Sequence, residues 1–231
     1  MHVRNIAYAA VLAGLVITAP AGATTITVTW TGTVLGGNDP GNVFGVPLTG
    51  GIHDLAGQSF SAMYRIDSNI GSLVSGPGFY DLRGGLAFAL ASPVLGSSLT
   101  INGQTALFGS ADFAGYSREN TPGRSNIYTE VNHTPGLPGA VDVLFLSEFR
   151  FDQTIPFNLL TDPLSRTVGS TGRGVFQKFN SSGVGQFSGN FTPTFVSIAV
   201  ESAPPTGIPE PSTWAMVLSG IGLLAISRRR N

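Results

Sequence analysis

The sequence predicts an all-β fold, an antiparallel β-sandwich or jelly roll, flanked by an N-terminal signal peptide and a single C-terminal hydrophobic helix. Two observations predict the β class: short runs in which apolar and polar residues alternate, and frequent Gly, Pro, Asn and Ser between these runs. The 231-residue chain contains 31 Gly and 15 Pro. Because these residues interrupt the sequence so often, no stretch in the middle of the chain suits a long helix. Many short strands joined by such turns are typical of sandwiches and jelly rolls.

The first predicted strands lie at the start of residues 24–203, the central part of the chain, which we call the body. Residues 25–30 place Ile26, Val28 and Trp30 on one face, because the side chains of a strand alternate between its two faces. Residues 60–66 repeat the pattern with Phe60, Ala62, Tyr64 and Ile66. Further alternations predict strands at 86–90, 98–101, 104–108, 127–131, 173–179, 184–188 and 191–200.

The clearest strand signal covers residues 141–151. One face of this strand would carry the apolar residues Val141, Val143, Phe145, Phe149 and Phe151. The other face would carry Asp142, Glu148 and Arg150 beside two leucines. Because period-two spacing separates the faces, we expect the aromatic face to pack in the core and the charged face to be solvated.

Turn signals connect these runs. Asn102-Gly103 lies between two β-like runs and predicts a hairpin, since both residues tolerate positive φ, and residues 181–183 predict a second hairpin. Two long loops are expected at residues 36–57 and 108–126, and one helical turn at 162–166. Loops of a sandwich gather at its ends, where binding usually occurs.

The charge of the body excludes one class of partner. The chain has 12 Lys+Arg and 13 Asp+Glu, but four arginines (residues 4 and 228–230) and Glu210 lie in the end segments, so residues 24–203 carry about −4. Such a body is not expected to bind nucleic acid. Charged residues are 11 % of the chain, so neutral polar residues must form most of the surface, and the absence of cysteine excludes disulfides and thiolate chemistry.

Residues 1–23 have the features of a signal peptide. Arg4 supplies a basic start, and residues 6–18 are almost continuously apolar. The small residues Ala21 and Ala23 stand at the positions that signal peptidase reads, which places the cut before Thr24. A retained anchor is the alternative, but a run of about 13 apolar residues is short of the roughly 20 that a spanning helix needs.

Residues 209–231 have the features of a membrane stop. A linker rich in Pro and Ala, residues 204–208, separates them from the body of residues 24–203. Residues 213–227 are apolar or small on every face, which predicts one transmembrane helix. The helix is followed by three arginines, which cross hydrocarbon only at high cost and should stay in the cytoplasm: Arg228, Arg229 and Arg230.

The tail resembles a known sorting signal. Pro209, Glu210 and Pro211, followed by Ser-Thr-Trp-Ala-Met, the apolar segment and the three arginines, resemble the PEP-CTERM sorting signal, which is also labelled an ice-binding protein C-terminal domain. The resemblance implies a Gram-negative bacterium that makes exopolysaccharide. It also implies exosortase, a membrane-embedded cysteine transpeptidase that recognises the Pro-Glu-Pro region and releases the protein toward the surface or matrix. The two prolines keep this tripeptide extended and out of the helix.

The body offers weak candidates for catalysis. His53 and His133 lie in segments rich in Gly and Pro, where solvated loop histidines are expected, and a Gly-x-Ser-x-Gly elbow is absent. A glycosidase could pair two of Asp142, Glu148 and Asp152, but Asp142 and Glu148 lie about 20 Å apart along one strand. We therefore predict no catalytic residue.

Candidates for binding are also few. Residues 38–42, Asn-Asp-Pro-Gly-Asn, offer oxygen ligands to calcium, but they lack the EF-hand spacing and also suit an ordinary turn, so no metal or cofactor is predicted. Tyr116 and Tyr128, at the edges of the second long loop, are the aromatic residues best placed to stack on a sugar. Trp30 is assigned to the core.

These observations predict a non-enzymatic, exported bacterial protein. We expect it to pass through the inner membrane and then reach the outer surface or the extracellular matrix, in an exopolysaccharide or biofilm context. Its expected partners are signal peptidase, an exosortase-type transpeptidase and exopolysaccharide. Two alternatives stay open for the body: a carbohydrate-binding β-sandwich module, and a secreted glycan-active hydrolase.

Overall fold

The computed structural model describes residues 24–109, 112–134, 141–150 and 163–202, and its regular elements are strands with one short 3-10 helix. Residues Ala23–Ala203 form one compact unit. The strands are β1 (Thr24–Asn38), β2 (Ser59–Asp67), β3 (Ser72–Gly76), β4 (Phe79–Gly84), β5 (Val94–Ile101), β6 (Gln104–Phe108), β7 (Phe113–Thr121), β8 (Arg124–His133), β9 (Asp142–Arg150), β10 (Leu164–Thr167), β11 (Arg173–Phe179) and β12 (Gly185–Ser202), with the helix η1 (Leu86–Phe88) between β4 and β5. The prediction of an all-β, antiparallel fold is confirmed.

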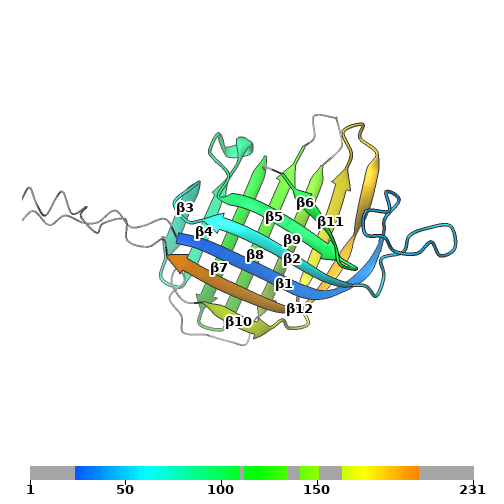
Figure 1. The fold of residues 1–231 in the computed structure, drawn as a ribbon. Helices are drawn as coiled ribbons and strands as arrows, with labels where there is room; N and C mark the ends of the chain where they lie inside the picture. Colours follow the sequence, from blue (N-terminus) through cyan, green and yellow to red (C-terminus); the bar gives the residue numbers. More distant parts are fainter. Residues whose placement is uncertain (1–23, 110–111, 135–140, 151–162, 203–231) are drawn as a thin grey trace, which may run out of the picture. The chain divides into compact units, whose positions relative to one another are not determined.

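All the strands belong to one 12-stranded sheet with the order β3-β4-β7-β8-β9-β11-β12-β1-β2-β5-β6, and β10 pairs with β12 beside this path. Figure 1 shows that the sheet folds over on itself. β1, β2, β5 and one half of β12 form a layer that crosses a second layer of β4, β7, β8, β9 and β11. The two layers are therefore halves of one continuous sheet.

Two long bent strands connect the layers. β1 and β12 pair from Thr24, opposite Ser202, through to the far end of β1, and the pairing shifts register next to Gly32 and again next to Gly36. Such shifts bend a strand and increase its twist. Glycine is required at the first shift, because a Cβ at Gly32 would lie 2.2 Å from the carbonyl oxygen of Thr192.

The core lies between the two layers. All the residues that the alternation predicted to face inward in the first two strands are buried: Ile26, Val28, Trp30, Phe60, Ala62, Tyr64 and Ile66. Val34, farther along β1, is buried as well. The hydrogen bonds that join the layers include two from buried aromatic side chains: Trp30 Nε1–H donates to Thr129 Oγ1 (2.9 Å), and Tyr64 O–H donates to the carbonyl oxygen of Leu144 (3.0 Å). Each bond satisfies a polar atom that burial removes from water, and the assignment of Trp30 to the core is confirmed.

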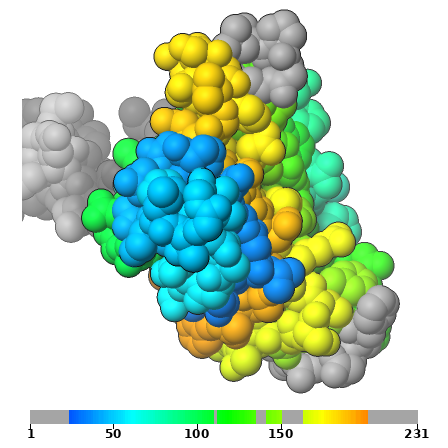
Figure 2. Space-filling model, turned by 90° about the vertical axis from the view of Figure 1, so that its right-hand side faces the viewer, coloured from blue at the N-terminus to red at the C-terminus, as the bar shows by residue number. Residues whose placement is uncertain are grey.

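Both predicted hairpins are present. Asn102 (φ 50°) and Gly103 (φ 74°) join β5 to β6, and residues 180–184 join β11 to β12. The first long loop is also present, as residues 39–58 between β1 and β2. In Figure 2 this loop, coloured blue to cyan, projects toward the viewer.

The second predicted long loop, residues 108–126, is wrong. It contains β7 and a tight turn at Pro122-Gly123 that leads into β8. Pro followed by Gly with a φ of 78° is the arrangement that a type II turn requires. The inward residues of β7 are Ala114, Tyr116 and Arg118, so no apolar alternation marks this strand in the sequence.

Two short segments also differ from the prediction. Residues 86–90 form η1 and a turn, closed by backbone hydrogen bonds between Gly85 and Leu90, so their apolar side chains are exposed rather than part of a strand. The predicted helical turn at 162–166 is wrong for its described part, which belongs to β10. This segment pairs with the edge of β12 that β11 leaves open, because an unpaired strand edge favours pairing.

The strand predicted at 141–151 exists as β9, but its two faces are reversed. The inward residues are Asp142, Leu144, Leu146 and Glu148, whereas Val143, Phe145, Ser147 and Phe149 point outward. The prediction followed the larger number of apolar side chains, but the structure buries two leucines together with two carboxylates. Phe151 lies outside the described residues.

Candidate functional site

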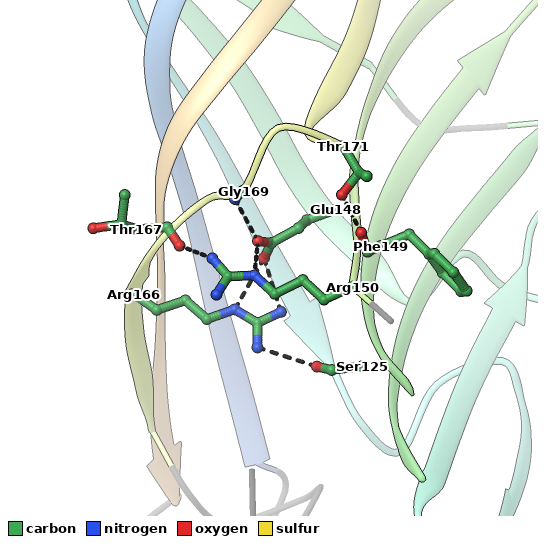
Figure 3. Close-up of polar contacts among 8 residues, drawn as sticks. All are labelled: Ser125, Glu148, Phe149, Arg150, Arg166, Thr167, Gly169 and Thr171. Carbon is green, nitrogen blue, oxygen red and sulfur yellow. Dashed lines mark hydrogen bonds and ion pairs between the residues drawn. The ribbon is translucent and has the colours of Figure 1, made fainter. Parts of the chain in front are cut away.

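One part of the interior holds a cluster of ionic side chains around Glu148 of β9 (Figure 3). Glu148 is fully buried, and its Oε2 accepts from Arg166 Nε (2.9 Å) and forms an ion pair with Arg166 Nη2 (2.8 Å). Its Oε1 accepts from the backbone amide of Gly169 (2.8 Å) and from Arg150 Nε. Arg166 Nη1 also donates to Ser125 Oγ (3.1 Å).

This cluster anchors β10 and the turn after it to β9. Each carboxylate oxygen of Glu148 already accepts charge-assisted hydrogen bonds, so the group is held in place rather than open to a substrate. Burial lowers the pKa of the Arg166 guanidinium, and Glu148 opposes that shift. Asp142 is also buried and accepts from the backbone amide of Phe179 (2.7 Å). The expectation that Asp142 and Glu148 lie on a solvated face is therefore wrong.

The remaining candidates for acid–base chemistry lie apart. His53 belongs to the 39–58 loop, and its Nδ1 lies 2.5 Å from the carbonyl oxygen of Val46. His133, expected in a loop, is instead the last residue of β8 and stands opposite Asp142. Within the described ranges, no three His, Asp or Glu side chains are grouped as a metal ion requires. Asp152 lies outside those ranges.

The candidate calcium loop is organised by Asp39. This side chain is fully buried, its Oδ1 accepts from the amide of Val43 (2.9 Å), and its Oδ2 accepts from the amide of Phe44 (2.7 Å). The Asp39 amide donates to the carbonyl oxygen of His53 (2.9 Å). The carboxylate oxygens thus hold the loop backbone, which is the turn chemistry that the sequence offered as the alternative to calcium.

The two tyrosines proposed for sugar contact differ in position. Tyr116 is fully buried on the inward face of β7 and cannot reach a sugar, so that assignment is wrong. Burial raises the pKa of its phenol to about 12, and the nearby Arg118 opposes the shift. Tyr128 lies on the outward face of β8, where its ring meets that of Phe145 edge-on at 5.5 Å.

Tyr128 lines a hollow on the outward face of the second layer. This hollow has a volume of about 660 Å³ and is lined by Asn126, Tyr128, Phe145, Ser147, Phe149, Thr171 and Arg173. Three further hollows continue it along β11 toward the end of β1. We name the whole run the outer-face groove and define it by Tyr128, Phe145, Phe149, Arg173, Val175 and Gln177. Sequence reasoning missed it because it assigned Phe145 and Phe149 to the core.

The residues with a predicted role in sorting lie outside the described residues, apart from Thr24, which is the first residue of β1. Comparison with protein families finds a match in the tail: the model of the PEP-CTERM protein-sorting motif matches residues 207–231. Residues 207–231 are a PEP-CTERM protein-sorting motif. The resemblance seen in the tail sequence is confirmed.

The PEP-CTERM motif identifies an exported protein that exosortase, a membrane enzyme, sorts toward the cell surface. The matched residues contain the whole Pro209-Glu210-Pro211 tripeptide and the three terminal arginines. No curated protein and no solved structure matches the chain. In the part of the chain that the structure describes, no helix is long and apolar enough to span a membrane, and the predicted helix 213–227 lies outside that part.

Proposed function

We propose that this is a non-enzymatic protein of the cell surface or extracellular matrix, delivered by its PEP-CTERM motif into an exopolysaccharide-rich biofilm. The observation that carries the proposal is the family match at residues 207–231. Residues 24–202 provide an all-β domain as the cargo of this sorting.

The route of export has three steps. Signal peptidase cuts between Ala23 and Thr24, with Ala21 and Ala23 in its pockets. The helix 213–227 then stops in the inner membrane, because the arginines that follow it resist transfer. Exosortase recognises the extended Pro-Glu-Pro segment and releases the domain from this intermediate.

The described domain supports a non-enzymatic role through its carboxylates. The buried groups Glu148, Asp142 and Asp39 each accept hydrogen bonds from the chain's own backbone, so each stabilises the fold. The alternative of a carbohydrate-binding module is favoured by a separate observation, the aromatic outer-face groove.

The sorting step is tested by replacing Pro209, Glu210 and Pro211 with alanine. This change leaves the apolar helix and its arginines intact, so the variant should insert in the inner membrane but accumulate there unprocessed. The measurement is membrane fractionation with an immunoblot against the β domain, in cells with and without exosortase. If the variant is released as efficiently as the parent, recognition of Pro-Glu-Pro is excluded and the tail acts as an anchor alone.

A further inference from the structure

We propose that the outer-face groove binds an extended, acidic polysaccharide chain. This inference deepens the proposed function and rests on it for the setting, because it assigns a ligand to a domain that the tail only delivers. Four properties of the groove carry it: its length, its aromatic rings, its charge, and the contrast with the opposite outer face.

The groove is long and open. Its four hollows overlap in pairs: the first two share Phe145 and Arg173, the next two share Val175 and Asn190, and the last two share Gln177 and Ser188. The run follows β11, whose residues at about 3.3 Å each span about 20 Å. A linear row of shallow hollows suits an extended polymer better than a compact small molecule, which an enclosed pocket would bury.

The lining has the chemistry that a sugar ring needs. Tyr128, Phe145 and Phe149 provide apolar ring surface, and the side chains between them are neutral hydrogen-bonding groups such as Asn126 and Ser147. The Tyr128 ring is held in position, because its O–H donates to Glu130 and its ring meets that of Phe145 edge-on. Rigid rings flanked by neutral donors and acceptors can contact both the C–H face and the hydroxyls of a sugar.

The charge of the groove favours an acidic polymer. Arg173 is exposed and is the one charged residue that lines the four hollows. The neighbouring carboxylate of Glu130 does not line a hollow and accepts hydrogen bonds from the Tyr128 hydroxyl and the Asn132 side-chain amide. Among the described residues, no carboxylate lies within ion-pair distance of Arg173. A guanidinium matches the two oxygens of a uronate carboxylate in a planar, bidentate arrangement.

The outer face of the first layer differs from the outer-face groove, because β1 presents no row of aromatic side chains there. Between residues 25 and 33 the outward residues of β1 alternate with the buried ones and are all threonines: Thr25, Thr27, Thr29, Thr31 and Thr33. A face of hydroxyl groups is well solvated without a ligand. A row of partly exposed rings is different, because a ligand that stacks on the rings removes apolar surface from water, which is favourable.

The test measures binding of the full-length protein, purified in a zwitterionic detergent that carries no sugar, to polygalacturonate and to neutral dextran. Polygalacturonate should bind more tightly than dextran. Phe145→Ala should weaken binding about tenfold, since one lost stacking contact is of that size. Arg173→Gln should reduce the affinity for polygalacturonate and remove its sensitivity to salt of about 1 M, where charges are screened beyond ~3 Å.

A second variant fills the groove with a larger side chain and removes no packed side chain. Ser147 stands directly opposite Arg173 on the neighbouring strand, so the glutamate of Ser147→Glu would pair with Arg173 and fill the hollow that Tyr128 lines. It should abolish binding while the thermal unfolding temperature stays at or above that of the parent. Thr29→Glu, which adds the same charge on the opposite outer face, and Phe195→Ala, which removes an exposed ring there, should bind like the parent.

The proposal is overturned if polygalacturonate does not bind, or if Ser147→Glu binds as well as Thr29→Glu. Preference for dextran would exclude the acidic ligand. These results are independent of sorting, because they use purified protein. If the protein is sorted correctly but does not bind polygalacturonate, only this inference is contradicted. If it binds polygalacturonate but is not processed by exosortase, only the proposed function is contradicted.

Discussion

At the scale of the residue, β9 shows how a charged side chain is accommodated in the interior. Glu148 takes an inward position next to leucines, and the cost of burying its charge is offset by two guanidiniums and the amide of Gly169. Arg150 lies two residues away on the same strand, but Arg166 and Gly169 lie 18 and 21 residues away, so the sequence around Glu148 does not indicate these two partners. A lone glutamate between apolar residues is more commonly a solvated strand residue, which is why its burial was not predicted.

Glu148→Gln should destabilise the domain strongly. The amide keeps the shape of the side chain but leaves the largely buried Arg166 side chain without its counter-charge, and removing one partner of a buried pair costs about 3–5 kcal/mol. The matched control is Asp81→Asn, which breaks the surface pair with Arg83 and should change stability by less than about 1 kcal/mol. Urea denaturation measures both, and equal effects of the two variants would contradict the anchoring role of Glu148.

At the scale of the element, the sequence predicted most strands that show a clear alternation of apolar residues, and it missed β4, a short strand with only two large inward side chains, Tyr80 and Leu82. β1, β2 and the β5–β6 hairpin were predicted because apolar alternation and the Asn102-Gly103 turn agree with each other. β7 was missed because it buries Arg118, and β9 was assigned the wrong face because its outward residues are the larger apolar ones. The outer-face groove was not predicted for the same reason. In the sequence, an apolar residue that lines a groove on a strand's outer face cannot be distinguished from one that packs in the core.

The two faces of β9 can be distinguished by a pair of substitutions. Leu146 is fully buried, so Leu146→Asp places an unpaired charge in the core, which costs several kcal/mol or more, and should leave the domain unfolded. The sequence alone predicts that result for Phe145→Asp, but the structure places Phe145 outward, so this variant should stay folded. Far-UV circular dichroism with thermal unfolding compares them, and unfolding of Phe145→Asp with a native-like Leu146→Asp would support the face assignment that the alternation predicts.

At the scale of the whole molecule, the sorting tail and the β domain differ in how much the sequence discloses. The tail is a linear signal: its tripeptide, apolar segment and basic end act in sequence order, so residues 207–231 can be recognised from the order of their amino acids alone. The site on the β domain cannot be recognised in this way, because residues of β8, β9, β11 and β12, which are separated along the chain, together form the outer-face groove. Its two ends nevertheless meet, since Thr24 pairs with Ser202.

The basic end of the tail should decide whether the chain stops in the membrane. Replacing Arg228, Arg229 and Arg230 with serine removes three residues whose transfer costs about 2.5–3.5 kcal/mol each at the centre of a membrane helix. The stop should weaken, and a larger share of the chain should pass the inner membrane without meeting exosortase. In cells that lack exosortase the parent should stay in the inner membrane, while the serine variant should appear in the periplasm. Replacement of the same arginines with lysine is the matched control, because it keeps the positive charge and should retain the parent's distribution. If the serine variant is also retained in full, the apolar segment alone is a sufficient stop and the arginines have no role in it.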